Sequence, residues 1–168
     1  MATVQADLTM LPERFQLEYV DSDGRPKRPV AIHRAILGSF ERFIGILIEH
    51  FAGAFPAWLT PVQARVLPVS AKHAEYAGAV HRRLVETGVR AELDARSEKL
   101  GYKVREAQVQ KVPYVLVVGE REAGEGTASV RKRGGEDVGA IPVDRFLVEV
   151  TAEIRTRAVT SPIGSERG

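Results

Sequence analysis

The sequence has no cysteine among its 168 residues, which excludes disulfide bonds and cysteine-ligated zinc sites within the chain. It also lacks any run of about 18 apolar residues, so no membrane-spanning helix and no membrane partner are expected. The N-terminus does not show the basic-then-apolar order of a secretory signal, and we therefore expect a cytoplasmic protein. A formal net charge of +2 with 27% charged residues excludes a strong polyelectrolyte and is typical of a globular protein.

Positive charge is concentrated in one segment, residues 96–133. This segment holds nine lysines or arginines against five glutamates, a local excess of four positive charges. A segment of this kind can form a basic surface that attracts phosphate groups. The same pattern is also typical of a solvated rim that binds nothing. Composition alone leaves both interpretations open.

The most informative stretch is residues 30–51, where an apolar strand turns at Gly38 and leads into a helix. Ser39 is placed to cap this helix with its hydroxyl. Arg42 lies on one side of the helical wheel with Gly45 next to it, so this side presents a cation beside bare backbone. The other side carries an apolar stripe at helical spacing, which comprises Phe40, Phe43, Ile44, Leu47, Ile48 and Phe51.

This stretch resembles the last signature motif of class II aminoacyl-tRNA synthetases, in the form found in the threonyl-tRNA synthetase family. The similarity continues over residues 49–58 and returns at 96–105 and 112–114, so it covers nearly the whole chain. The resemblance implies an α/β protein in two parts. Residues 1–58 are expected to be a fragment of the antiparallel catalytic sheet, and residues 59–168 a three-layer anticodon-binding domain with a mixed sheet.

Hydrophobic periodicity supports the same division, because two prolines interrupt the pattern near residues 56–61. Beyond them the order β-α-β-α-β-β-α is typical of a three-layer α/β domain. The expected strands of this part are 64–69, 89–93, 114–118 and 127–133, and the expected helices are 72–87, 99–110 and 143–157. The tail after Ala158 is expected to fray.

The first part is expected to contain strands over residues 3–8, 15–20 and 28–33. These strands lack the neighbours of a wide sheet, so they leave unpaired backbone groups along an edge. We therefore expect the first third of the chain to be less stable than the rest. Met1 directly precedes a strand that belongs inside a catalytic domain, which favours a partial gene or a cut piece.

Several residues of the first part match positions that act in catalysis in the family. The resemblance implies that Arg42 lies against the adenine and phosphates of ATP, a role that suits a planar cation. Ser39 belongs to the same motif, and Thr3 and Gln5 match a strand that contacts the adenylate and the amino acid. His33 matches a histidine that is a zinc ligand in the family, where the zinc recognises the amino and hydroxyl groups of threonine. A zinc site needs three or four converging ligands, so a histidine bonded to a backbone carbonyl is the alternative for His33.

The resemblance implies a threonine–tRNA ligase, which uses ATP with Mg²⁺ and zinc to join threonine to tRNA-Thr. The other zinc ligands and the second ATP-binding arginine of the family have no counterpart in this sequence. We therefore expect the chain alone to bind neither ATP nor zinc and to be inactive. The family homodimer rests largely on segments that are also missing, so a monomer is expected.

In the second part, the resemblance implies contacts with the anticodon stem-loop of tRNA-Thr. The corresponding positions are Ser97, Lys111, Glu122 and Arg131. Ser97 stands where the family commonly has asparagine, and Lys111 where it commonly has arginine. Unpaired bases are read by edge-directed hydrogen bonds and by stacking, which carboxylate and guanidinium groups can provide. Two alternatives stay open: a stand-alone RNA-binding or interaction module without catalysis, and a plain α/β domain without a specific ligand.

Overall fold

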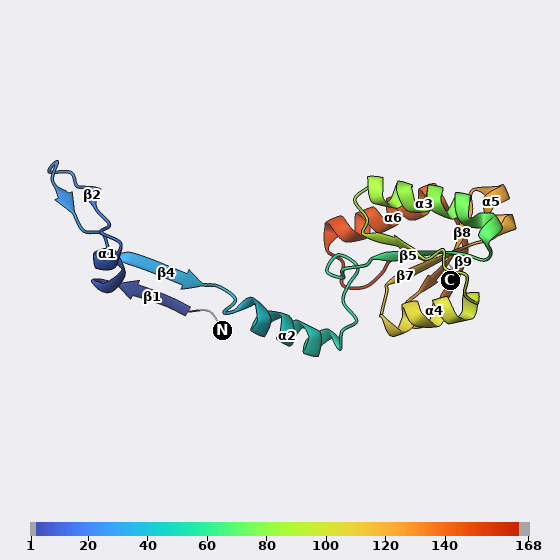
Figure 1. Ribbon diagram of the computed structural model, residues 1–168, viewed down its shortest axis with the longest axis horizontal. Coiled ribbons are helices and arrows are strands. Elements are labelled where there is room, and N and C mark those ends of the chain that lie inside the picture. The colour runs from blue at the N-terminus through green and yellow to red at the C-terminus, as the bar shows by residue number, and fades with distance from the viewer. Residues whose placement is uncertain (1–2, 165–168) are drawn as a thin grey trace. The chain divides into compact units, whose positions relative to one another are not determined.

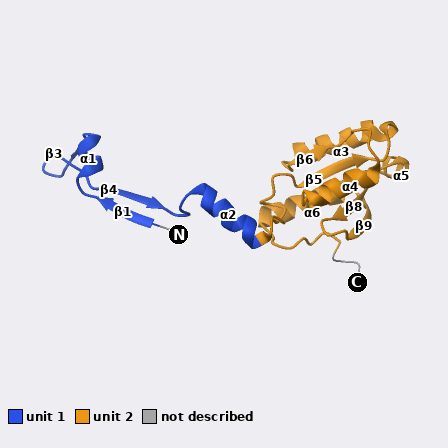
Figure 2. Cartoon of the chain, turned by 60° about the horizontal axis from the view of Figure 1, so that its bottom comes forward, with its two compact units in different colours: residues 1–50 blue, residues 51–168 orange. Residues whose placement is uncertain are grey.

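The structure is a computed structural model that describes residues 3–164. The chain forms two compact units, unit 1 (residues 1–50) and unit 2 (residues 51–168), as Figures 1 and 2 show. The sequence pattern predicts the boundary between the two parts later, after Trp58. Within residues 3–164, no helix combines the length and the apolar character that a membrane crossing requires.

Unit 1 consists of two small antiparallel ribbons and a short helix, followed by the helix that leads out of the unit. The strands are β1 (Thr3–Asp7), β2 (Tyr19–Val20), β3 (Pro26–Lys27) and β4 (Ala31–Ala35), and the helices are α1 (Met10–Arg14) and α2 (Phe40–Phe51). β1 pairs with β4, and β2 pairs with β3. The predicted strand over residues 15–20 is wrong in its first four residues. The amides of Phe15 and Leu17 bond back to the carbonyls of Leu11 and Pro12, so these residues close α1 instead.

Unit 1 buries almost none of its apolar side chains. Pro12 is the single buried residue among residues 3–50, and α2 has none, although its apolar stripe is present as predicted. Ile32 on β4 is 71% exposed and Phe40 on α2 is 78% exposed. Full burial of a large apolar side chain contributes about 1.5–3 kcal/mol, so unit 1 gains little from these residues. This lack of a core is the physical reason to expect unit 1 to be the less stable part.

Unit 2 is a three-layer α/β domain with a mixed five-stranded sheet, which confirms the predicted fold class. The strand order is β6-β5-β7-β8-β9; β5 pairs in parallel with β6 and β7, and β8 and β9 complete the sheet in antiparallel pairing. The strands are β5 (Ala64–Pro68), β6 (Ala91–Leu93), β7 (Tyr114–Val118), β8 (Thr127–Lys132) and β9 (Asp137–Pro142). The helices are α3 (Ala74–Glu86), which follows the 3-10 turn η1 (Ala71–His73), α4 (Leu100–Val109), α5 (Glu120–Glu125) and α6 (Val143–Thr156).

Two apolar cores hold the layers of unit 2 together. The larger core lies between the sheet and the pair α3 and α6, and Phe146 is fully buried in it. The smaller core lies under α4 on the other face and comprises Leu67, Val104, Ala107, Val112, Val115 and Val117. Among the described residues, no side chain of β8 or β9 belongs to this smaller core. Helix α4 therefore packs over β5 and β7 and leaves the same face of β8 and β9 without an apolar cover.

The sequence pattern missed two elements of unit 2 and misjudged the tail. Helix α5 has only six residues, and β9 contains a glycine and ends in proline, so neither has a clear periodic signal. The prediction that the tail frays is wrong for its described part. Ile163 is 1% exposed in the larger core, and the hydroxyl of Ser161 bonds to Tyr114. These two contacts anchor the described part of the tail.

Candidate nucleic-acid interface

Two of the predicted anticodon-contacting residues, Ser97 and Glu122, lie where the parallel strands end. Ser97 is exposed in the loop between β6 and α4 and lines a pocket of about 460 Å³ with residues that follow β5, including Val69. Glu122 on α5 follows β7, and its carboxylate accepts a hydrogen bond from the amide of Gly119 at 2.9 Å. A Cβ added to Gly119 would lie 3.1 Å from Glu122 and 3.3 Å from Val69. Ligand sites of α/β sheets usually form at this carboxyl edge.

The other two, Lys111 and Arg131, lie toward the opposite end of β7. Lys111 follows α4 in the left-handed conformation, with φ of 57°, and its ammonium group donates to the carbonyl of Ala52. Arg131 lies opposite Val115 in the β7–β8 register, so its side chain is on the sheet face that carries α4. Its guanidinium pairs with Asp137 at 3.3 Å, and its side chain is 43% exposed, although its Nε is buried without a hydrogen-bond partner among the described residues. The exposed part of the Arg131 side chain is therefore accessible to a ligand.

The four residues do not form one cluster, but three of them are arranged around α4. Ser97 and Lys111 flank the two ends of this ten-residue helix, which is about 15 Å long. Arg131 lies on the same sheet face. The amide of Gly119 donates to Glu122. Gly119 lies four residues after Val115, which is opposite Arg131, and four residues of extended chain span about 13 Å. Separations of this size suit an extended ligand such as unpaired RNA better than a small molecule.

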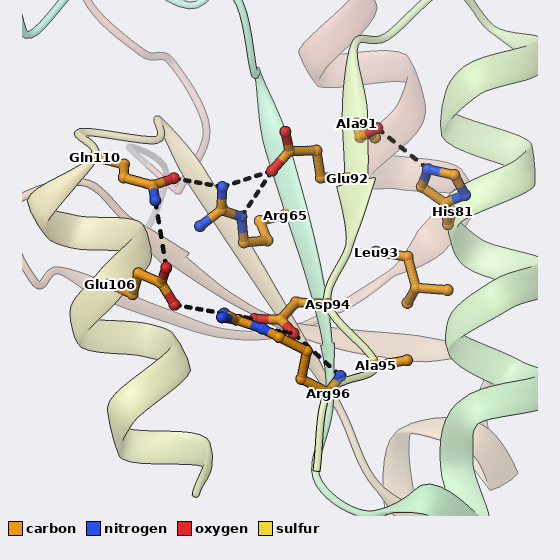
Figure 3. Close-up of a pocket in the computed structure, with 10 residues that line it drawn as sticks. All are labelled: Arg65, His81, Ala91, Glu92, Leu93, Asp94, Ala95, Arg96, Glu106 and Gln110. Atoms are coloured by element: carbon orange, nitrogen blue, oxygen red, sulfur yellow. Dashed lines mark hydrogen bonds and ion pairs between the residues drawn. The ribbon is translucent and has the colours of Figure 1, made fainter. Parts of the chain in front are cut away.

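The loop that carries Ser97 is held by ion pairs (Figure 3). Arg96 donates to the two carboxylate oxygens of the buried Asp94 at 2.8 and 2.6 Å, and it also pairs with Glu106 on α4. The buried ammonium group of Lys103 donates to the carbonyl of Asp94 at 3.2 Å. The Arg96 guanidinium lowers the pKa of Asp94, and the two carboxylates raise the pKa of Arg96. Asp94 and Arg96 therefore stay charged near neutral pH.

A second polar cluster holds the backbone of Lys111 from inside unit 2. Arg133 donates to the carbonyls of Phe55 at 2.7 Å and Lys111 at 3.2 Å. The hydroxyl of Tyr114 donates to the carboxylate of Glu153 nearby. Burial raises the pKa of Glu153 and of Tyr114 and lowers the pKa of Arg133. This cluster fixes the linker and the start of β7, and its Tyr114 and Glu153 side chains are too buried to read a base.

In unit 1, the predicted substrate-binding residues share one face of the β1–β4 ribbon. Gln5 pairs with His33 and Thr3 pairs with Ala35, and residues in direct register place their side chains on the same side. His33 is exposed. Residues 3–164 contain no group of three or more histidine, cysteine, aspartate or glutamate side chains placed to hold a metal ion. The described residues therefore do not form a zinc site by themselves.

The start of α2 has the local geometry that the sequence predicts. The hydroxyl of Ser39 accepts a hydrogen bond from the amide of Arg42 at 3.3 Å. The side chain of Arg42 is exposed, and a Cβ added to Gly45 would meet no atom within 4 Å. This leaves open space beside the guanidinium for a planar ligand such as a nucleotide base.

Comparison with protein families divides the chain close to the boundary between the two units. Residues 1–51 match the tRNA synthetase class II core domain (G, H, P, S and T), and residues 63–153 match the anticodon binding domain. The chain is 58% identical over 157 residues to the threonine–tRNA ligase of Caldanaerobacter subterraneus subsp. tengcongensis, and 53% identical over 158 residues to that of Symbiobacterium thermophilum. Each match covers 94% of this chain and 24% of the relative. The chain thus spans about a quarter of the length of the curated relatives it matches.

Solved structures similar to this chain include two from Cryptosporidium parvum. The RNA binding domain of threonyl-tRNA synthetase from Cryptosporidium parvum Iowa II has a TM-score of 0.73 and 36% identity, over 96% of this chain and 39% of that chain. A prolyl-tRNA synthetase from Cryptosporidium parvum shares the fold. Its TM-score is 0.62, with 21% identity over 87% of this chain and 32% of that chain. The resemblance noted from the sequence is confirmed. The chain belongs to the anticodon binding domain family, begins with a segment of the class II synthetase core, and has threonine–tRNA ligases as its relatives.

Proposed function

We propose that this chain is the anticodon-recognising part of a threonine–tRNA ligase and that unit 2 binds the anticodon stem-loop of tRNA-Thr. The observation that carries this proposal is the placement of Ser97, Lys111 and Arg131 around α4, with Glu122 at the adjoining sheet edge. The match of residues 1–51 to the class II core domain favours a ligase over a stand-alone binding module.

The chemistry of two of these residues suits the bases of a threonine anticodon. Threonine codons begin with A and C, so the last two anticodon bases are G and U. The guanidinium of Arg131 can donate to the O6 and N7 acceptors of guanine. One carboxylate oxygen of Glu122 accepts a hydrogen bond from the amide of Gly119. The other oxygen can therefore accept from a base N–H. A donor and an acceptor placed in this way can distinguish G and U from other bases.

We further propose that unit 1 belongs to the catalytic domain of this ligase. Arg42 would lie against the adenine and phosphates of ATP at the N-terminal end of α2, which Ser39 caps. Thr3 and Gln5 would contact the adenylate and threonine from the β1–β4 ribbon. Bound ATP with Mg²⁺ supplies the activation of the threonine carboxylate. The contribution of this chain is to position the adenine and the amino acid, and the remaining catalytic groups come from the rest of the enzyme.

Zinc binding is not a property of this chain alone. His33 would be one ligand in the intact ligase, and a zinc site requires three or four. We therefore expect no bound metal and no aminoacylation activity from the isolated chain. We also propose a cytoplasmic protein whose isolated chain is a monomer, because the homodimer of the family depends largely on catalytic segments outside this sequence.

The proposal is tested with two RNA hairpins of identical stem and loop length, one with a threonine anticodon and one with a scrambled loop. The full chain should bind the first hairpin at least about tenfold more tightly, as each specific base contact contributes about 1–3 kcal/mol. Fluorescence anisotropy at several fixed salt concentrations measures both affinities, and both should fall as salt rises. Equal affinity for the two hairpins would leave only a non-specific basic surface and overturn the proposal.

A further inference from the structure

A continuous chain of polar side chains links the loop that precedes α4 to the C-terminal part of the helix at Glu106 and Gln110 (Figure 3). We propose that this chain positions Ser97 and Lys111 for base recognition, and that Arg96 is its central positioning residue. The inference rests on the proposed function, because it concerns how the anticodon-contacting residues are held. It assigns roles to residues that do not themselves touch RNA.

The first half of the polar chain holds the loop that leads into α4. Arg96 directly precedes Ser97. Its Nε and one terminal nitrogen donate hydrogen bonds to the carboxylates of Asp94 and Glu106. Asp94 is buried, and its amide bonds to the carbonyl of Val66 on β5 at 3.0 Å. The loop is therefore tied to the sheet at Asp94 and to the helix at Glu106. This arrangement restricts where Ser97 can lie.

The second half of the polar chain fixes the end of α4. Glu106 accepts a hydrogen bond from the side-chain amide of Gln110 at 3.5 Å. Gln110 in turn accepts from the buried guanidinium of Arg65 at 2.6 Å, and Arg65 pairs with Glu92 at 2.5 Å. Gln110 directly precedes Lys111. The same network thus ends next to the two candidate base-contacting residues that flank α4.

The pocket between these side chains has a volume of about 610 Å³, but its charges are already paired with one another. Arg65 and Arg96 face Glu92, Asp94 and Glu106, and a ligand would have to break these ion pairs to bind. A supporting framework explains this arrangement better than a ligand site. The fork of Arg96 is essential to it, since one guanidinium holds two carboxylates from two different elements.

The test compares Arg96→Lys with wild type in the hairpin-binding experiment. Lysine keeps the charge but cannot form the fork, so the preference for the threonine-anticodon hairpin should fall about tenfold while the salt dependence stays unchanged. Ser97→Ala should lower the preference in wild type and have no further effect in the Arg96→Lys background. Arg83→Lys is the matched control, because it alters an ion pair with Asp144 between α3 and α6 and should leave the preference unchanged.

Several outcomes would overturn the inference. A retained preference in Arg96→Lys, or additive effects of the Arg96 and Ser97 changes, would show that Arg96 does not act through Ser97. A lower salt dependence would identify Arg96 as a phosphate contact instead. If Arg96→Lys does not fold by circular dichroism, Glu106→Gln replaces it and should lower the preference in the same direction; an unchanged preference overturns the inference. A wild-type chain without any preference would instead refute the proposed function.

Discussion

Replacement of Phe146 by alanine is expected to lower the free energy of unfolding of unit 2 by about 3–5 kcal/mol. Phe146 is 0% exposed in the larger core, and its ring packs edge-on against Tyr114 with a centroid distance of 5.5 Å. The truncation removes these contacts and leaves a cavity between α6 and the sheet. Urea unfolding followed by circular dichroism measures the change.

The matched control is Phe40→Ala on α2. Phe40 is 78% exposed, so its loss should change the free energy of unfolding by no more than about 0.5 kcal/mol. The two substitutions remove the same side chain, and the difference between them reports where the chain has a core. Equal destabilisation by both substitutions would contradict the assignment of a core to unit 2 alone.

Replacement of Arg131 by alanine is expected to weaken binding of the threonine-anticodon hairpin by about 1–3 kcal/mol and to reduce the preference over the scrambled hairpin. The side chain lies on the open sheet face beside α4 and is held at one side by Asp137. Glu122→Ala should likewise reduce the preference, because it removes a base acceptor and no cation. Anisotropy titrations of both hairpins provide the measurement.

Arg121→Ala is the control for these two variants. Arg121 is exposed on α5 next to Glu122, and its only ion pair within the described chain is with Glu125 on the same helix. Its loss should weaken both hairpins to a similar extent, as expected for a contact with phosphate alone. If Arg131→Ala also weakened both hairpins equally, Arg131 would not read a base.

The fold of unit 2 could be predicted because its long elements have clear periodicity. The apolar run Tyr114–Val118 and the stripes of α3 and α6 indicate buried elements without reference to the rest of the chain. Helix α5 and β9 could not be predicted in this way. They are short and glycine-containing, and tertiary pairing with β8 rather than local preference defines β9.

Unit 1 shows a different limit of sequence reasoning. The apolar stripe of α2 and the Ser39 cap were predicted and are present, but a stripe does not show what covers it. In this chain nothing in the described part of unit 1 buries the stripe. The curated relatives are about four times as long, and we expect the rest of the catalytic domain to cover these residues in the intact ligase.

The residues of the candidate site could be predicted, but the side chains that hold them in place could not. Family resemblance names Ser97, Lys111, Glu122 and Arg131, and none of them stands out by composition. The framework that holds two of them depends on contacts between residues distant in sequence, such as Arg65 with Gln110. The sequence contains one signal of this framework. An arginine inside the otherwise apolar strand Ala64–Pro68 needs a buried partner, and this could have directed attention to Arg65.

The central claim is that residues 51–168 fold by themselves and contain the surface that recognises unpaired bases. An amide ¹H–¹⁵N spectrum of this segment, titrated with the threonine-anticodon hairpin, tests it most directly. The account predicts a dispersed spectrum in which shift changes concentrate around the ends of α4, α5 and β8. A collapsed spectrum, or changes centred on α3 and α6, would contradict it.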